Sequence, residues 1–493
     1  MRQAVEFRGT PYDDDALHEE CGVFAITNSS DAAAHCALGL HALQHRGQEA
    51  AGIVTSDNEH FYIHTALGHV GDNFNSQDVI DKLVGDAAIG HVRYSTAGGT
   101  HVKNIQPMFA EMSFGGLAIA HNGNLTNAAT LRRQLVSRGC IFQSTMDTEV
   151  IVHLVATSVH FSFIDRLIDA LKQVEGAYSL VAMSRDCVVG VRDPRGVRPL
   201  VLGMMGESYV LASETCALDI IGADYVRDVE PGEVIVLKDG KLQSLKPFAP
   251  QSHRFCVFEY VYFARPDSYV DGKHVYEARR RIGEELARES TVDGDVVVPI
   301  PDSGVPAAIG YAHEAKIPFE LGIIRNHYVG RTFIEPGDTI RHLGVKLKHN
   351  ANRGVIEGKR IILIDDSIVR GTTSRKIVAM MREAGAKEVH MRIASPPTTH
   401  SCFYGVDTPE REKLLAANYT VEEMAKLIGA DTLSFLSIDG LYRAMGVIGR
   451  DNQSPAYCDA CFTGDYPIVL TDKNNGEVSN GSCLVSQSPP RRK

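Results

Sequence analysis

The residues best suited to chemistry lie in the run IILIDDSIVRGTTS, residues 361–374. An apolar stretch ends in Asp365 and Asp366, and a short loop leads to Gly371 and the hydroxyl side chains of Thr372–Ser374. The uninterrupted apolar stretch predicts a parallel strand buried on both faces. Its carboxyl end is where open α/β sheets bind ligands, and the helix start that follows favours an anion. The run therefore predicts a site for a sugar phosphate. The alternative is an ordinary strand–loop–helix with exposed acids.

The length and charge of the chain bound its class. Its 493 residues predict two or three domains. Its 50 Lys and Arg against 61 Asp and Glu give a net charge of −11, which argues against non-specific nucleic-acid binding. No stretch is apolar enough to span a bilayer, and residues 1–20 lack the apolar core of a secretory signal. Ten cysteines without such a signal predict a cytoplasmic protein whose thiols bind metal or do catalysis.

The front of the chain predicts an α+β domain over residues 21–250, layered with helices outside sheets. Helices are expected around residues 42–50, 128–138 and 164–175. Strands are expected at 21–26, 87–95, 115–121, 178–183, 188–193 and 209–213, with a hairpin over 232–245 that turns at Asp239-Gly240.

The back of the chain, residues 251–470, changes to strand–loop–helix units. The strand 295–300 precedes a helix at 306–315, the strand 361–366 precedes a helix after Gly371, and 389–395 forms the next strand. This order predicts a doubly wound parallel sheet, with a domain boundary near Pro247–Pro250. Residues 471–493 are polar and predict a disordered tail.

Cys21 opens the first predicted strand, a position where a cysteine is usually a small buried apolar side chain. Four motifs beyond it favour another interpretation: QHRGQEAAGI at 44–53, GHVRYST at 90–96, HNGNL at 121–125 and MDTE at 146–149. Together they resemble the class II glutamine amidotransferase domain, which has the N-terminal-nucleophile αββα fold. The resemblance implies cleavage between Glu20 and Cys21, so that residues 1–20 form an autocatalytically removed propeptide.

Cys21 is then the nucleophile that attacks the glutamine amide, with its freed α-amino group handling the proton. The resemblance makes Asn122 and Gly123 the oxyanion hole. It also implies that Arg93 pairs with the α-carboxylate of glutamine, that Asp147 accepts from the α-ammonium group and that Arg46 orders the site. His91 and His121 are expected to be structural.

The run at 361–374 resembles the phosphoribosylpyrophosphate (PRPP) motif of type I phosphoribosyltransferases. The resemblance implies that Asp365 and Asp366 bind the ribose hydroxyls or Mg²⁺, and that Ser303 in the loop Pro301–Gly304 reaches the same metal. The 5-phosphate would be held by Arg370, Gly371, Thr372, Thr373 and Ser374. The basic segment 325–350 resembles the loop that closes over PRPP, with Lys346 binding substrate; the alternative is a solvated basic loop.

Both halves in this order resemble the amidophosphoribosyltransferase family. The implied reaction converts glutamine, PRPP and water into 5-phosphoribosylamine, glutamate and pyrophosphate, the first committed step of de novo purine synthesis. The resemblance also implies an internal ammonia channel, inhibition by purine nucleotides and a homotetramer. No nucleic-acid or membrane partner is expected.

Cys256, Cys402, Cys458 and Cys461 suit a structural Zn²⁺ site or a [4Fe–4S] cluster, and they could also be unrelated thiols. Their contexts, RFCVFEY, HSCFYGVD and YCDACF, resemble the iron–sulfur subgroup of the family, as does the propeptide.

Two other functions compete with this interpretation. A glutaminase could feed ammonia to another acceptor, as in relatives of glucosamine-6-phosphate synthase or asparagine synthetase, but those lack the run at 361–374. A PRPP-sensing regulator could use the same transferase fold without catalysis, but it would not need Cys21 with Asn122 and Gly123.

Overall fold

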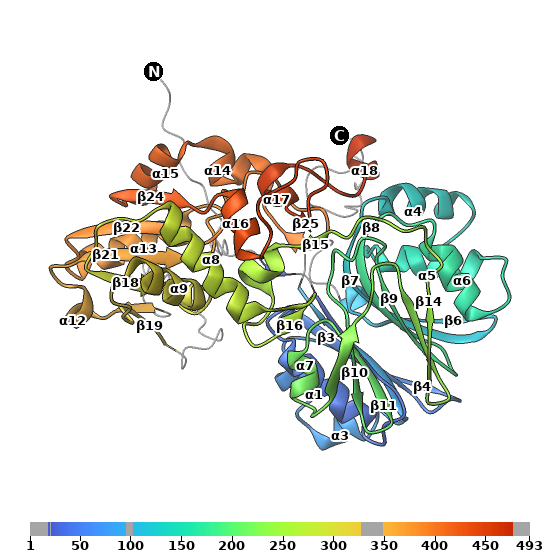
Figure 1. Ribbon diagram of the computed structural model, residues 1–493. Coiled ribbons are helices and arrows are strands. Elements are labelled where there is room, and N and C mark those ends of the chain that lie inside the picture. The colour runs from blue at the N-terminus through green and yellow to red at the C-terminus, as the bar shows by residue number, and fades with distance from the viewer. Residues whose placement is uncertain (1–17, 20, 95–101, 327–348, 477–493) are drawn as a thin grey trace, which may run out of the picture. The chain divides into compact units, whose positions relative to one another are not determined.

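The computed structural model describes residues 18–19, 21–94, 102–326 and 349–476, which form two compact units. The large unit contains residues 18–276, 400–410 and 451–476, and the small unit contains residues 277–399 and 411–450. The predicted boundary near residue 250 therefore does not coincide with the edge of the large unit, which recruits two further segments from the back of the chain (Figure 1).

The large unit is built on two antiparallel sheets. The seven-stranded sheet has the order β12 (Asp224–Asp228), β10 (Val201–Met205), β11 (Ser208–Ala212), β2 (Gly22–Ile26), β5 (Ala87–Arg93), β3 (Ala50–Ser56), β4 (Phe61–Leu67). The six-stranded sheet has the order β14 (Lys241–Leu245), β13 (Val234–Lys238), β9 (Val188–Arg192), β8 (Gly176–Met183), β7 (Gly115–Leu125), β6 (Met108–Met112). The predicted strands and the hairpin at Asp239-Gly240 are confirmed.

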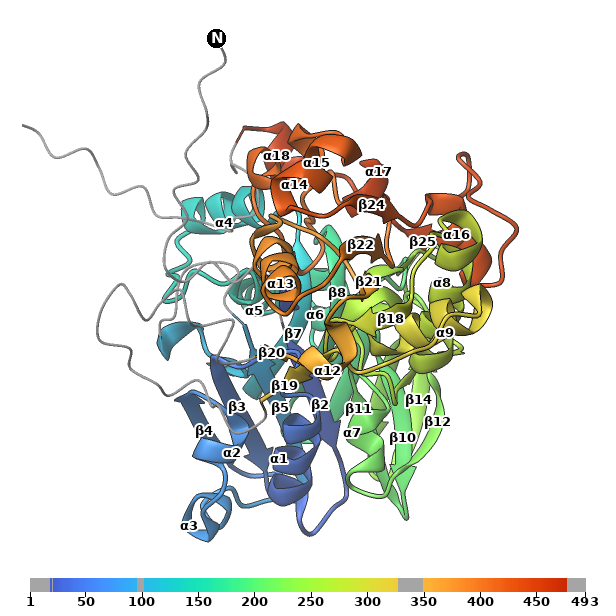
Figure 2. The same cartoon turned by 90° about the vertical axis from the view of Figure 1, so that its left-hand side faces the viewer.

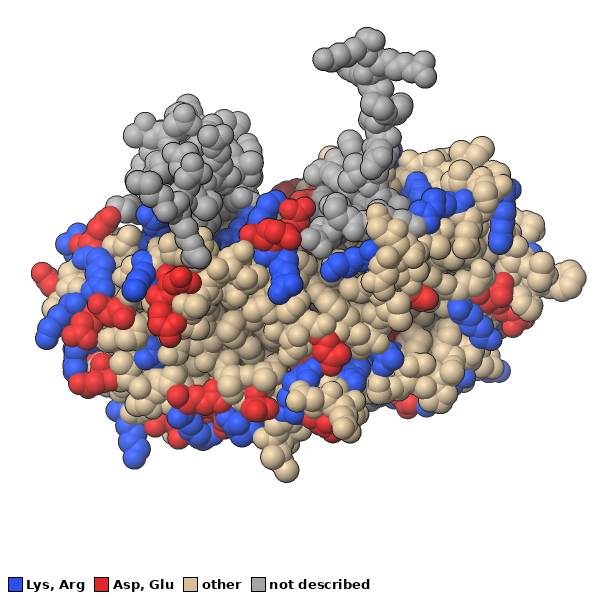
Figure 3. Space-filling view, turned by 90° about the horizontal axis from the view of Figure 1, so that it is seen from above, with Lys and Arg blue, Asp and Glu red and all other residues tan. Residues whose placement is uncertain are grey.

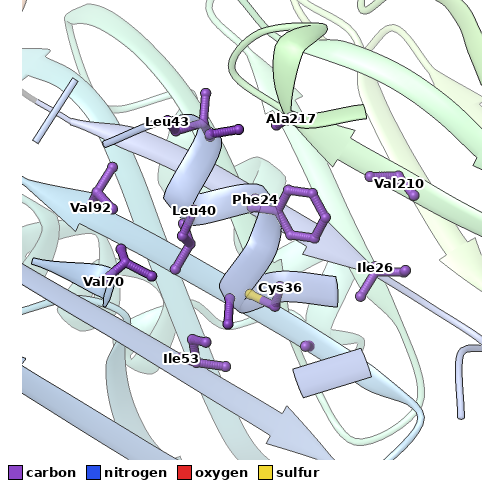
Figure 4. Packing of buried hydrophobic residues seen from close by; sticks show 14 of the residues in the cluster. Phe24, Ile26, Cys36, Leu40, Leu43, Ile53, Val70, Val92, Val210 and Ala217 are labelled. Atoms are coloured by element: carbon purple, nitrogen blue, oxygen red, sulfur yellow. The ribbon is translucent and has the colours of Figure 1, made fainter. Parts of the chain in front are cut away.

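Strand β2 shows how the sheets pack. Val23 and Ala25 join the apolar layer between the two sheets, while Phe24 and Ile26 point the other way, into the cluster under helix α1 (Ala32–Ala42). Successive side chains of a strand alternate between faces, so burial on both sides explains the unbroken apolar sequence. Figure 4 shows Phe24 beside the helix that carries Cys36 and Leu40.

The helix expected at residues 42–50 is a wrong prediction. The helix ends at Ala42, and the chain turns through Gly47 before β3 begins. An added Cβ at Gly47 would lie 2.5 Å from the backbone nitrogen of Arg93, so this stretch packs directly on β5. The alanine-rich helix α1, which ends just before this stretch, is the helix that packs on the seven-stranded sheet.

Helices α4 (Ala128–Ser137), α5 (Thr148–Thr157) and α6 (Phe163–Leu171) cover the six-stranded sheet. Helices α4 and α6 match their predictions. Helix α5 has no predicted counterpart because its β-branched sequence, TEVIVHLVAT, is apolar on most sides. The helices thus lie outside the paired sheets, which confirms the αββα layering.

The small unit has a parallel four-stranded sheet in the order β18 (Val296–Pro299), β21 (Arg360–Asp365), β22 (Glu388–Ile393), β24 (Thr432–Phe435). Leu363 stands between Val298 and Met391 in register. These three side chains share a core with helices α13 (Thr372–Glu383) and α15 (Val421–Ile428), and Figure 2 shows α13 beside β21 and β22. Helices α8 (Val275–Glu289) and α9 (Val305–Ala315) complete the predicted α/β unit.

The predicted tail is ordered at its start. Residues 471–474 form α18, and the carboxylate of Asp472 accepts hydrogen bonds from Ala129 N at 2.7 Å and Thr130 N at 3.0 Å, at the N-terminus of α4. The carboxylate satisfies backbone donors that a helix start leaves unpaired, which explains why this polar segment is fixed. Residues 477–493 lie outside the described part of the chain.

The surface carries charges of both signs. On the face drawn in Figure 3, Lys and Arg lie interspersed with Asp and Glu. In the described ranges, no helix has the length and apolar character that crossing a bilayer requires.

Candidate functional site

Cys21 lies directly before β2 and is 6% exposed. Its neighbour Gly22 pairs with Val92 of β5, which places Cys21 beside the end of the strand that carries Arg93. The guanidinium of Arg46 donates through Nε to the carbonyl oxygen of Cys21 at 3.2 Å. Two of the predicted site residues, Arg46 and Arg93, therefore border the cysteine.

Arg46 belongs to a fully buried ion network. It pairs with Glu214 and, at 2.9 Å, with Glu259, which also accepts from Arg198 at 2.9 Å. Burial alone would raise the pKa of Glu214, but His45 and Arg46 hold it well below its usual range. These partners are protein groups around Cys21, in keeping with an ordering role for Arg46. Direct contact between Arg46 and substrate stays a prediction.

The predicted oxyanion residues lie in β7, in the facing sheet. The Nε2 atom of His91 in β5 lies 3.1 Å from the backbone carbonyl oxygen of His121. This contact joins the two sheets one residue before Asn122. Asn122 is fully buried, and neither atom of its side-chain amide has a hydrogen-bond partner among the described residues. Because a buried amide without partners is costly, this side chain is suited to receive a ligand group.

Gly123 follows with a φ of +140°. A Cβ added there would lie 2.0 Å from the carbonyl oxygen of Ala177 in β8. A side chain at this position is excluded both by backbone conformation and by space. The backbone of Gly123, which carries no side chain, lies beside the unpartnered Asn122 amide, and this arrangement fits an oxyanion hole.

Asp147 caps the N-terminus of α5. Its carboxylate accepts from Thr148 N and Leu125 N, both at 2.9 Å. Burial would raise the pKa of Asp147, but His121 and these backbone donors hold it below its ordinary value. Asp147 thus stays ionised and fixes Leu125, two residues beyond Gly123. Its contact with the ammonium group of glutamine stays a prediction.

His91 fits the structural role expected of it. It is fully buried, and burial is the main cause that lowers its pKa to about 3. The imidazole is therefore neutral at neutral pH, and its ring contacts the backbone of the facing sheet.

The small unit assembles the predicted sugar-phosphate residues at the carboxyl end of β21. Asp365 and Asp366 are 8% and 7% exposed, and Asp366 N donates to Asp365 Oδ1 at 3.0 Å. Burial raises the pKa of Asp366, while hydrogen bonds from Ser303 and Ser367 oppose that rise. Ser303 therefore lies beside Asp366, and the metal that the two residues are expected to share stays a prediction.

Two glycines shape the loops of this site. Gly371 has a φ of +79° and directly precedes α13, whose first residues are Thr372, Thr373 and the buried Ser374. A Cβ at Gly304 would lie 2.6 Å from Ile364 O, so the loop 301–304 packs against the end of β21. Backbone donors, hydroxyl groups and carboxylates thus converge, as phosphate and ribose binding requires. Lys346 and most of the segment 325–350 lie outside the described residues.

The four cysteines named above gather in the large unit. Cys256 of β15 (Phe255–Cys256) stands opposite Cys458 of β25 (Tyr457–Cys458). Burial raises the pKa of the Cys461 thiol well above its usual value, and the other three thiols of the group raise it further. The backbone nitrogen of Tyr404 also donates to Cys402 Sγ at 3.3 Å. Among the described residues, however, no group of three or more His, Cys, Asp or Glu side chains is arranged to hold a single metal ion.

Known proteins share both units. A glutamine amidotransferase domain model matches residues 91–219, and a phosphoribosyl transferase domain model matches residues 267–395. The amidophosphoribosyltransferase of Rhizobium etli is 59% identical over 495 residues, which cover 99% of this chain and all of the relative. This chain belongs to the amidophosphoribosyltransferase family. It is a pentosyltransferase that joins a class II glutamine amidotransferase domain to a type I phosphoribosyltransferase domain.

Two comparisons with Bacillus subtilis support the assignment, one by sequence and one by structure. The Bacillus subtilis enzyme is 51% identical over 457 residues, covering 92% of this chain and 95% of the relative. The solved structure of B. subtilis glutamine PRPP amidotransferase complexed with ADP and GMP is 49% identical and aligns with a TM-score of 0.86. That alignment covers 91% of this chain and 98% of the solved one.

Several residues of this amidophosphoribosyltransferase site escaped the sequence analysis. Glu214 and Glu259 complete the ion network, and Gly405 lies against Gly123, where its added Cβ would be 2.9 Å from the Gly123 Cα. A lone acid within the aromatic run FEYVYF signals a buried, paired carboxylate at Glu259. No local signal marks Gly405, because its neighbour is 282 positions away in the sequence.

Proposed function

We propose that the large unit releases ammonia from glutamine at Cys21 and that the small unit uses Asp365 and Asp366 to bind the PRPP that receives it. The observation that carries the first half is the buried, unpartnered amide of Asn122 beside Gly123. A hydrogen-bond donor held there without a protein partner is what a developing oxyanion needs.

In the glutaminase half, the thiolate of Cys21 adds to the amide carbon of glutamine. The amide oxygen takes up the electron pair and is stabilised by the Asn122 side chain and the Gly123 N–H. The α-amino group of Cys21 takes the thiol proton as the thiolate forms and thereby becomes an ammonium group. Collapse of the adduct re-forms the carbonyl, breaks the C–N bond and releases ammonia, whose extra proton is returned by that ammonium group. Water then hydrolyses the thioester to glutamate. Arg93 and Asp147 hold the α-carboxylate and the α-ammonium group of the substrate.

This chemistry requires the α-amino group of Cys21 to be freed, so removal of residues 1–20 is part of the proposal. The strand β1 (His18–Glu19) pairs with β23 (Val406–Asp407), which supports a defined position for the segment just before Cys21. A fixed strand on one side of the Glu20–Cys21 bond would present that bond to the cysteine that cuts it.

In the transferase half, Asp365 and Asp366 accept hydrogen bonds from the ribose hydroxyls of PRPP. The backbone and hydroxyl groups of residues 370–374 hold the 5-phosphate at the start of α13. The carboxylate and hydroxyl oxygens of Asp365, Asp366 and Ser303 suit Mg²⁺, which would neutralise charge on the pyrophosphate. Ammonia forms a bond to the anomeric carbon, and pyrophosphate leaves with the electron pair of the broken C–O bond.

Product stoichiometry tests this function. Enzyme purified without oxygen is given PRPP and Mg²⁺ with either glutamine or ammonium, and glutamate and pyrophosphate are both measured. We expect one pyrophosphate for each glutamate with glutamine, and pyrophosphate alone with ammonium. Glutamate without pyrophosphate under every condition would instead support a PRPP-sensing regulator or another ammonia acceptor.

We further propose that Cys256, Cys402, Cys458 and Cys461 hold a [4Fe–4S] cluster. Each thiolate of such a cluster binds a different iron, so its ligands stand further apart than those of one ion. Burial raises the pKa of the Cys256, Cys458 and Cys461 thiols, and a bound cluster would displace their protons and hold the sulfurs as thiolates. The cluster would tie the segments of residues 256, 402 and 458–461 together, in a reducing setting such as the cytoplasm.

Metal analysis tests the cluster. We expect about four iron and four acid-labile sulfide per chain after purification without oxygen, and loss of both in Cys458→Ser. Cys140→Ser is the matched control, because Cys140 is a half-buried thiol outside the group. One zinc per chain in place of iron would contradict the proposal.

Inhibition by purine nucleotides and a homotetrameric assembly also stay proposals. The nucleotide proposal is supported by the B. subtilis relative, whose structure is described as complexed with ADP and GMP.

A further inference from the structure

The backbone of residues 403–405 lies against residues 123–124 of strand β7, although residues 403–405 follow the transferase sheet strand β22 in the sequence. We propose that Phe403 and Gly405 are positioning residues for the oxyanion hole of the glutaminase. They do not touch substrate, and they fix the backbone that does. The inference rests on the proposed role of Asn122 and Gly123.

Gly405 closes one side of Gly123. A Cβ added to Gly405 would lie 2.9 Å from the Cα and 3.2 Å from the carbonyl carbon of Gly123. On another side, the backbone of Ala177 leaves no room for a Cβ on Gly123 itself. Gly123 therefore sits between two backbones at contact distance, and the direction of its N–H is set by both.

Phe403 holds the residue that follows. The side-chain amide of Asn124 donates to the carbonyl oxygen of Phe403 at 2.9 Å. The end of β7 is also held by Asp147, which accepts a hydrogen bond from Leu125 N. The oxyanion backbone is thus fastened both to its own sheet and to the segment 403–405.

The positioning segment is itself anchored. Tyr404 accepts from Ile468 N at 3.0 Å and donates to Ile468 O at 2.6 Å. Cys402 N donates to Thr408 Oγ1 at 2.6 Å, which closes the turn around the segment. Because the segment is tied at both ends, Gly405 cannot retreat freely from Gly123.

An oxyanion hole acts on the transition state more than on bound glutamine. Displacing Gly123 by even a few tenths of an ångström should therefore lower kcat for glutamine hydrolysis and leave KM nearly unchanged. A loss of folded enzyme would also lower the apparent kcat, but it would lower the ammonium-dependent rate by the same factor. The inference therefore predicts a fall in kcat that is confined to the reaction with glutamine.

Gly405→Ala tests the inference, with Gly139→Ala as the matched control. Gly405 has a φ of +107° and Gly139 a φ of +94°, so both substitutions strain the backbone similarly. At Gly139 an added Cβ meets nothing within 4 Å, whereas at Gly405 it meets Gly123. The two variants therefore differ mainly in the steric contact that the added methyl group makes with Gly123.

For Gly405→Ala we expect kcat with glutamine to fall about ten- to hundredfold at unchanged KM. An aldehyde analogue of glutamine, whose adduct with Cys21 carries an oxyanion, should bind more weakly by the same factor. Pyrophosphate release with ammonium should stay at the wild-type rate, which also shows that the variant is folded. Gly139→Ala should match wild type in every assay.

Equal effects of the two glycine variants, or a rise in KM alone, would overturn the inference. If Gly405→Ala does not fold, Asn124→Ala provides a second test, because it removes the hydrogen bond to Phe403 without adding atoms near Gly123. Unchanged kcat in that variant would also count against the inference. Asn122→Ala distinguishes failure of the positioning role from failure of the proposed oxyanion hole. If this variant also leaves glutamine hydrolysis intact, the proposed oxyanion hole itself is wrong.

Discussion

Cys21→Ala is expected to abolish glutamine-dependent pyrophosphate release and to spare the reaction with ammonium. Without the thiol no thioester forms, and the Asn122 amide has no adduct to stabilise. Loss of a catalytic nucleophile costs at least about a thousandfold in kcat. Cys21 is 6% exposed and Ala is smaller, so the substitution removes the sulfur without a clash. Glutamate and pyrophosphate formation, measured with each nitrogen source, give the two rates.

Cys187→Ala is the control for this experiment. Cys187 is also a buried thiol of the large unit, and burial raises its pKa to about 11, so it is not a thiolate at neutral pH. We expect it to retain glutaminase activity. Glutamate release by Cys21→Ala at the wild-type rate would remove Cys21 from the mechanism.

The double variant Asp365→Asn, Asp366→Asn is expected to lose pyrophosphate release with both nitrogen sources. Each carboxylate contributes charge-assisted hydrogen bonds that are worth about 1.5–3 kcal/mol, so the pair accounts for a loss of about a thousandfold in kcat/KM for PRPP. Asparagine keeps the size of each side chain and removes the charge. Glutamate release measured without PRPP should equal that of wild type without PRPP, because the glutaminase residues are unchanged.

Asp295→Asn provides the matched control. Asp295 pairs with Arg360 at the opposite end of the same strand β21, where its side chain is 39% exposed. A surface pair contributes little, about 0–1 kcal/mol, so pyrophosphate release should stay near the wild-type rate. Wild-type PRPP kinetics in the double variant would exclude the two aspartates from the site.

Much of the fold could be predicted from local patterns of apolar and polar residues. The strands around the layer between the sheets are recognisable because their residues are apolar on both faces, as in β2. The parallel sheet of the small unit follows from strands that end in polar loops before helices. Helix α5 was missed because β-branched residues in a buried helix resemble a strand.

The candidate site was predictable where short motifs carry the chemistry, as in HNGNL and IILIDDSIVRGTTS. The residues that hold these motifs in place through hydrogen bonds and ion pairs were not predictable. Glu259 reaches Arg46 across 213 positions and Phe403 reaches Asn124 across 279 positions, so no local pattern connects them. The ordered residues 471–474 were assigned to the tail because the capping of α4 by Asp472 is likewise a contact between distant segments. Family membership is now confirmed, whereas the iron–sulfur cluster and the propeptide stay predictions.

The division of the large unit along the chain has a consequence for the order of folding during synthesis. The described residues of the small unit, 277–399 and 411–450, lie between the first and the last described segments of the large unit. Domains generally fold as their chain leaves the ribosome, and a unit cannot be completed before its last segment has been made. The large unit acquires Asp472, which caps α4, only after residue 450 of the small unit has been made. Thus the small unit can be completed first, and an amidotransferase half released at residue 250 would lack Glu259, the carboxylate that pairs with the buried Arg198.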